Sequence, residues 1–144
     1  MSDEATIRSS LEIVNGNLQF RSYPTDFNGD VTGNKGPSPG ALTVTVYGES
    51  VTFSELTTPG YCRIMNQDDS ETVDIGMYDV ETDKFYPIFE VRAGEIYVVR
   101  LSSLLGNEYP GVGTGTGTSG ATTNLFHLRS RTTDCIVTVE AFET

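Results

Sequence analysis

Apolar and polar residues alternate along several short stretches of the chain. In LTVTVY, residues 42–47, leucine or valine fills every second position and threonine or tyrosine fills the others. Successive side chains of a β-strand point to opposite faces, so this pattern indicates a strand with one buried face. Comparable runs predict strands at 7–14, 17–22, 51–56, 61–66, 72–78, 85–91, 96–101, 125–129 and 135–142.

Turn signals separate these runs. The Asn15-Gly16 pair suits the positive φ angles of a type I′ hairpin turn, and Gly48-Glu49 and Ala93-Gly94 are each expected to close a further hairpin. The one helical candidate, SSLLGNEY at 102–109, is too short to count as a helix. The pattern therefore predicts an all-β fold, either a β-sandwich or a jelly-roll-like barrel of about 8–10 antiparallel strands.

Three segments interrupt the strand pattern within what we expect to be a single domain, 1–144. Residues 1–10 are predicted to form an N-terminal arm. Residues 23–40, rich in Gly, Pro, Asn and Asp, and residues 109–124, a Gly/Thr repeat, are predicted to form long flexible loops; the alternative is arms that become ordered against a neighbouring subunit. The G-x-G spacing at 109–124 does not indicate nucleotide binding, because it neither follows a strand nor opens a helix.

Charge narrows the range of partners. The chain has 9 basic and 20 acidic residues, a net charge of −11. Binding to nucleic acid or to an anionic membrane surface depends on lysine and arginine, so we expect neither as a partner. The same charge favours solubility at high local copy number. The acidic, polar start MSDEATIRSS does not have the pattern of a signal peptide, and no apolar run is long enough to cross a bilayer.

The residues with reactive side chains form no recognisable catalytic pattern. His127 is the single histidine, and catalytic triads and zinc sites need a histidine with properly arranged partners. We interpret it as a packed or edge-strand residue. Cys62 and Cys135 lie in predicted strands and are expected to be reduced, buried thiols, although a disulfide between them stays open. We therefore predict no enzyme activity, no catalytic residue, no metal and no cofactor.

Two acidic turns and one calcium-like spacing are the remaining candidates for polar chemistry. Residues 68–71 and 79–83 are expected to be solvated hairpin tips. Asp26, Asn28 and Asp30 match the first three ligand positions of a calcium loop, yet Val31 and Pro37 stand where glycine and glutamate belong. That segment is more consistent with an Asx-rich turn, and a structural calcium site is the alternative.

Tyrosines suggest a further alternative, because sugar-binding sandwiches stack such rings on their ligands. Half-buried strands are also enriched in tyrosine for packing reasons alone. The choice depends on which of these rings share a face. The candidates are Tyr47, Tyr61, Tyr78, Tyr86, Tyr97 and Tyr109.

One long stretch resembles a known group of proteins. TTPGYCRIMN, an acidic turn, VDIGMYD and FYPIFEVRAGEIYVVRLS follow one another over residues 57–102. This order resembles a group of small virion proteins of tailed bacteriophages, and the terminal strand at 136–140 is also similar. The positions that carry the pattern are Thr58, Pro59, Gly60, Tyr61, Asn66, Asp68, Val73, Ile75, Gly76, Pro87, Gly94, Glu95, Arg100 and Leu101.

The resemblance implies a β-sandwich that binds on or within a virus particle after synthesis in the host cytoplasm. The leading expectation is a capsid decoration (cement) protein, a homo-oligomer with a trimer favoured, whose partner is the major capsid protein or another virion protein. A tail or head–tail connector component that forms rings is one alternative. A carbohydrate-binding virion module is the other. The resemblance carries over no catalytic residue.

Overall fold

The computed structural model of the chain describes residues 5–29, 31, 33–80, 82–102 and 123–144, and these form β-strands without a helix. The twelve strands are β1 (Ala5–Ser9), β2 (Glu12–Asn15), β3 (Leu18–Arg21), β4 (Thr25–Gly29), β5 (Ser38–Val44), β6 (Glu49–Ser50), β7 (Pro59–Asn66), β8 (Val73–Asp79), β9 (Lys84–Val91), β10 (Ile96–Arg100), β11 (Thr123–Ser130) and β12 (Cys135–Glu143). The all-β prediction is confirmed.

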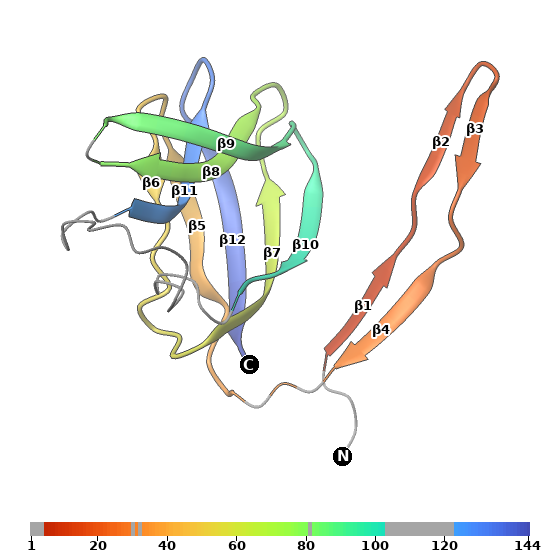
Figure 1. Ribbon diagram of the computed structural model, residues 1–144, viewed down its shortest axis with the longest axis horizontal. Coiled ribbons are helices and arrows are strands. Elements are labelled where there is room, and N and C mark those ends of the chain that lie inside the picture. The colour runs from red at the N-terminus through yellow and green to blue at the C-terminus, as the bar shows by residue number, and fades with distance from the viewer. Residues whose placement is uncertain (1–4, 30, 32, 81, 103–122) are drawn as a thin grey trace, which may run out of the picture.

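Eight of the strands form two four-stranded sheets that pack face to face (Figure 1). The strand order is β10-β7-β12-β5 in one sheet and β6-β11-β8-β9 in the other, and the described pairs are antiparallel. Of the two predicted architectures, the sandwich is therefore the one observed. We call these two sheets and their connections the sandwich.

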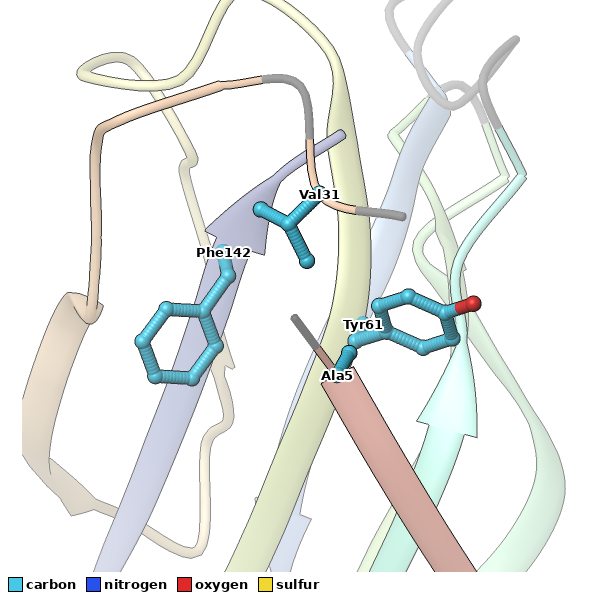
Figure 2. A pocket seen from close by; sticks show the side chains of 4 residues that line it. All are labelled: Ala5, Val31, Tyr61 and Phe142. Carbon is cyan, nitrogen blue, oxygen red and sulfur yellow. The ribbon is translucent and has the colours of Figure 1, made fainter. Parts of the chain in front are cut away.

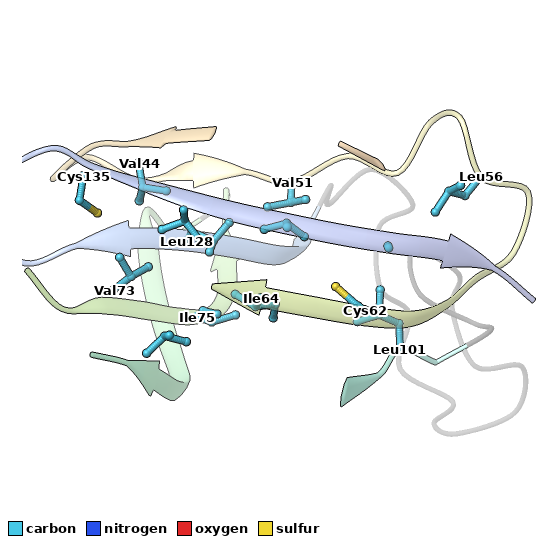
Figure 3. Packing of buried hydrophobic residues seen from close by; sticks show 14 residues of the cluster. Val44, Val51, Leu56, Cys62, Ile64, Val73, Ile75, Leu101, Leu128 and Cys135 are labelled. Carbon is cyan, nitrogen blue, oxygen red and sulfur yellow. The ribbon is translucent and has the colours of Figure 1, made fainter. Parts of the chain in front are cut away.

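The core lies between the two sheets and follows the alternation in the sequence. In β12, Cys135, Val137, Val139 and Ala141 are buried, whereas Ile136 between them is half exposed. Figure 3 shows side chains from both sheets meeting in this layer. Burial of each such aliphatic side chain stabilises the fold by about 1.5–3 kcal/mol, so this layer is the main source of stability.

Two predicted hairpins, at Gly48-Glu49 and at Ala93-Gly94, do not form, because β5 and β6 lie in different sheets, as do β9 and β10. The turn at Ala93-Gly94 does not pair β9 with β10, because the chain crosses from one sheet to the other there. Gly94 adopts a φ of +72° and donates its N–H to the carbonyl of Asp68, 3.0 Å away, so the turn is held by another loop. The turn signal is correct, but a local turn does not specify the sheet that the next strand joins.

The predicted strand at 51–56 is also wrong. Only Glu49 and Ser50 form a short strand, β6, and the chain after them is a loop. Leu56 donates its N–H to the carbonyl of Phe53, which marks a turn. Val51 and Leu56 nevertheless enter the core, so the apolar alternation reflects burial of a loop at the edge of the sandwich.

The remaining four strands form one long two-stranded ribbon that projects from the sandwich (Figure 1). β1 pairs with β4 near the sandwich, and β2 pairs with β3 toward the tip. We call residues 5–29 the arm.

The turn at the tip of the arm differs from the predicted one. Asn15 pairs with Leu18, so the turn residues are Gly16 and Asn17 instead of Asn15 and Gly16. Gly16 has a φ of +56°, and Asp83 is the one described non-glycine residue with positive φ. Positive φ at the first turn position alone fits a type II′ turn, in which glycine takes that position.

The arm also corrects the boundaries drawn from composition. The segment 23–40, predicted as a long loop, contains β4 and the first residues of β5. The predicted N-terminal arm, 1–10, contributes β1, which is one edge of the longer ribbon. Most of the Gly/Thr segment at 109–124 and of the helical candidate at 102–109 lies outside the described residues, and residues 123 and 124 begin β11.

Candidate interaction surface

The outer half of the arm is uncovered by the rest of the described chain. Every residue of β2 and β3 is exposed, on both faces of the ribbon. A hairpin of two strands is marginally stable in water by itself, since neither face is packed. The arm is therefore the part of the structure that most needs a partner.

The register shows that the arm has one apolar face. Residues directly opposite each other in an antiparallel pair point to the same side. Ile13 lies opposite Phe20, and Leu18 is two positions from Phe20, so these three side chains share a face. Glu12 lies opposite Arg21 on the other face. The outer half of the ribbon is therefore amphipathic.

The half of the arm near the sandwich repeats this division. Ile7 lies opposite Phe27, and the neighbouring pair, Arg8 with Asp26, points to the opposite side. Seven large apolar side chains of the arm are substantially exposed. They are Leu11 (54%), Ile13 (39%), Val14 (69%), Leu18 (60%), Phe20 (51%), Tyr23 (84%) and Phe27 (55%). Val14, opposite Gln19, lies on the polar face, but Ile13, Leu18 and Phe20 share the other face. Apolar residues gathered in this way mark an interaction site, whereas scattered ones do not.

On the polar face of the arm, each basic side chain pairs with an acidic one. Arg8 donates two hydrogen bonds to the carboxylate of Asp26, at 2.7 and 2.8 Å, and this contact lowers the pKa of that carboxyl group. Arg21 lies 3.9 Å from the carboxylate of Glu12. These two basic and two acidic residues are the only charged residues of the arm, so its net charge is zero and the rest of the chain carries the full −11.

The base of the arm is seated on the end of the sandwich. The rings of Phe27 and Tyr61 lie 6.5 Å apart, and the guanidinium of Arg100 lies 4.9 Å above the Tyr61 ring and donates to its hydroxyl at 3.0 Å. A side chain in place of Gly29 would collide with the Tyr61 hydroxyl. The arm therefore leaves the sandwich beside the ends of β7 and β10.

A small apolar pocket marks this junction. Its volume is about 300 Å³, and Ala5, Val31, Tyr61 and Phe142 line it (Figure 2). The lining comes from β1, the segment after the arm, β7 and β12. These described lining residues are apolar apart from the Tyr61 hydroxyl, so the pocket lies where the base of the arm packs against the sandwich.

The residues considered for catalysis are packed in the structure. Nδ1 of His127 is 3.2 Å from the Ser50 hydroxyl, and the ring stacks on Tyr78 at 5.0 Å. Burial lowers the pKa of His127, and its Nε2 has no hydrogen-bond partner among the described residues. The interpretation of His127 as a packed residue is confirmed.

Cys62 and Cys135 are both buried and free, so the reduced state is the correct alternative. Burial raises the pKa of the Cys62 thiol to about 12. A thiol with so high a pKa carries almost no thiolate near neutral pH, and the thiolate is the reactive form.

In the first acidic turn, Asp69 and Ser70 are exposed as predicted, but the prediction is wrong for Glu71. This residue is only 5% exposed, and its carboxylate accepts hydrogen bonds from the Thr132 hydroxyl at 2.5 Å, from the Thr132 N–H and from the Arg131 N–H. These donors, with the Thr132 hydroxyl foremost, lower the pKa of Glu71 to about 2. Glu71 joins this turn to the loop before β12.

The second acidic turn and the calcium-like spacing form no site among the described residues. Thr82 donates to Asp79, and the Tyr78 hydroxyl donates to Asp83. Asp26 and Asn28 lie in a strand and not in a loop, and Asp26 is engaged by Arg8; Asp30 lies outside the described residues. In the part of the chain that the structure describes, no three His, Cys, Asp or Glu side chains are grouped to hold a metal ion.

The tyrosines are dispersed over the molecule. Tyr47 and Tyr78 line one polar pocket of about 300 Å³ together with Asp83, Phe85 and Arg129. Tyr61 lies at the base of the arm, and Tyr86 and Tyr97 are in different sheets. Tyr109 lies outside the described residues. A platform of many rings is therefore absent from the described part of the chain, and one two-tyrosine pocket is present.

The arm is the feature that sequence analysis identifies only in part. The Asn-Gly signal predicts a hairpin at the correct place, but the apolar alternation of its strands is the same as that of core strands.

The described residues contain no helix that could span a membrane. Comparisons with protein-family models, with curated proteins and with solved structures found no match to this chain.

Proposed function

We propose that this chain is a structural protein of a tailed-bacteriophage virion, a decoration (cement) protein that binds the outer surface of the capsid and stabilises the shell. The observation that carries the proposal is the arm, an amphipathic ribbon whose apolar face is uncovered. A protein that acts by contact needs such a surface and needs no reaction centre.

The resemblance of residues 57–102 supplies the class of protein, and the structure explains what its positions do. Asn66, buried in β7, donates to the carbonyls of Glu71 and Val91 and accepts from the N–H of Asp68. Gly76 passes so close to Tyr86 that a side chain there would collide with its carbonyl. These positions build turns and strand crossings, so they support a shared fold and assign no binding residue.

The proposed mechanism is mechanical. The sandwich lies over the seam between capsid subunits, and the arm reaches a neighbouring subunit. A specific contact buries about 1,600 Å² in total, and repetition of the contact around the shell adds avidity to a weak single contact. The net charge of −11 keeps the free protein soluble at the copy number that a shell demands.

The number of copies per particle tests this proposal. Mass spectrometry of purified virions is expected to find hundreds of copies of this chain, on the order of the number of capsid subunits. A copy number that matches one ring would contradict decoration and favour the alternative, a tail or head–tail connector component.

A capsid-binding assay tests the role of the arm. Ile13→Lys places a charge on the apolar face, and Val14→Lys places the same charge on the opposite face one residue away. Ile13→Lys is expected to lower occupancy on expanded capsids, and Val14→Lys is expected to bind as the wild type does. Full occupancy by Ile13→Lys would refute the arm as the contact element.

One observation favours a second candidate, a carbohydrate-binding virion module. Tyr47, 88% exposed, lines the polar pocket with the carboxylate of Asp83 and the guanidinium of Arg129. A ring for stacking beside a donor and an acceptor suits a neutral sugar. Binding on a glycan array that is lost in Tyr47→Ala and kept in Tyr23→Ala, an exposed tyrosine of the arm, would establish this candidate; an empty array would remove it.

A further inference from the structure

Three of the four edge strands of the sandwich have features that block pairing with another chain. β5 contains Pro39, β6 has only two residues, and β9 contains Pro87 beside a break in its register with β8. Proline, shortness and bulges are the usual ways in which a sheet edge is protected from a further strand.

The fourth edge strand, β10, lacks these features. Its sequence is IYVVR, without proline or a carboxylate, and it pairs in unbroken register with β7. Ile96 is 50% exposed, Tyr97 41% and Val98 49%. Among the described residues its partner strand is β7 alone, so its outer edge is an exposed apolar template for another strand.

The two strands of the arm differ in the same way. Between the paired residues Ser9 and Glu12 lie two residues, whereas between their partners Thr25 and Arg21 lie three. The return strand of the ribbon is thus irregular, and the extra residue falls in a segment that contains Pro24. The outgoing strand, 5–15, has neither irregularity, so it is the edge of the arm that can pair.

Charge decides which surface the arm can approach. Two copies of the sandwich repel each other, since the chain outside the arm has 7 basic and 18 acidic residues. The arm has a net charge of zero, and β10 carries one arginine and no carboxylate. Contact between the arm and β10 therefore lets two copies of this chain meet without opposing acidic surfaces.

The positions of the arm and of β10 also allow two copies of the chain to exchange arms. The arm is rooted at Tyr61, which pairs with Arg100 at the end of β10, so the arm and β10 lie on the same side of the molecule. The arm stands away from β10 of its own chain (Figure 1). Two surfaces placed in this way allow a closed oligomer, in which each copy gives an arm and receives one.

We propose that the outgoing strand of the arm, residues 5–15, adds beside β10 of a second copy and extends its sheet. This pairing gives the open backbone edges of both strands hydrogen-bond partners and links copies of the chain into an oligomer. The inference rests on the proposed function only in that the arm is taken as the contact element, and its test uses the purified chain without capsids.

Sedimentation velocity of the full chain over a range of concentrations tests this pairing. The wild type is expected to associate, and Ile13→Lys and Val98→Lys are each expected to shift association to concentrations about tenfold higher or more, since a lysine blocks an edge. Thr43→Lys, on the protected edge β5, is the matched control and is expected to associate as the wild type does. A wild type that sediments as a monomer throughout would overturn the inference, as would association that survives both arm and edge variants.

Cross-linking between two different variants shows that the contact is between copies. Ile13→Cys mixed with Val98→Cys is expected to give a covalent dimer with a short bismaleimide, because Cys62 and Cys135 are buried and do not compete. Ile13→Cys mixed with Thr43→Cys is expected to give none. Cross-linking equal in the two mixtures would overturn the pairing with β10. A chain that passes these tests yet fails to bind capsids would retain this inference and refute the proposed function.

Discussion

The sandwich and the arm are built from the same kind of sequence but differ in what covers them. Ile64 of β7 is fully buried between two sheets, whereas Ile13 of β2, in an equally regular strand, is exposed. The chain outside the arm carries the whole net charge of −11 and the arm carries none. Alternation therefore defines an apolar face, and the rest of the molecule decides whether that face is covered.

The largest expected effect is a cavity in the core. Ile64→Ala is expected to lower the free energy of unfolding by about 2–5 kcal/mol, because buried atoms are lost and the surrounding sheets cannot close the space. Ile13→Ala, the same change in the arm, is expected to alter it by less than about 0.5 kcal/mol. Chemical denaturation of both variants measures the difference. Equal losses would mean that the arm is packed in the free chain.

A smaller effect is expected from the buried amide of β7. Asn66→Ala removes the hydrogen bonds to the Glu71 and Val91 carbonyls, and the expected loss is about 1–3 kcal/mol. The matched control, Asn28→Ala, changes an exposed asparagine of the arm and is expected to leave the denaturation midpoint unchanged. A neutral Asn66→Ala would show that these hydrogen bonds contribute nothing.

The third expected effect depends on pH. The pKa of Glu71 is lowered to about 2 in the folded state, so its stabilising contribution is complete above the usual glutamate pKa of about 4.5 and is lost as pH falls toward about 2. Thermal midpoints measured across this range are expected to fall more steeply for the wild type than for Glu71→Gln. Asp26→Asn, in the arm, is expected to keep the wild-type slope. Parallel curves for the wild type and Glu71→Gln would contradict the assignment.

The smallest effect on the free energy of unfolding is expected from a substitution on the apolar face of the arm, which is also expected to weaken capsid binding. Phe20→Ser on the apolar face of the arm is expected to leave the free energy of unfolding within about 0.5 kcal/mol of the wild type and to weaken capsid binding. Gln19→Ser, on the polar face, is the control for both measurements. A stability loss as large as that of a core variant would remove the distinction between the two regions.

The sequence predicts a strand and its buried face correctly where the alternation within that strand is sufficient to define them. The alternation of Val137 and Val139 with more exposed neighbours predicts β12 and its buried face, and the same rule predicts β7 and β8. It fails where the outcome depends on distant partners. Val51 and Leu56 alternate like a strand but belong to a buried loop, and the burial of Glu71 depends on donors from the loop before β12.

The arm could be predicted as a hairpin but not as an uncovered one. Nothing in the alternation of Leu11 and Ile13 distinguishes an apolar face that is packed inside the chain from one that is left open. The neutral charge of residues 5–29 in a strongly acidic chain was the available signal, because a segment that must contact another protein is relieved of the repulsion that the rest of the surface carries.

Hydrogen exchange of the arm tests the central claim, that its apolar face is open in the free chain and covered in the particle. Amide exchange would be followed by mass spectrometry in the dilute free protein and in the protein bound to capsids. We predict that residues 5–29 exchange quickly when free and become protected when bound, while β7 and β12 are protected in both states. Equal exchange of the arm in the two states would contradict the claim.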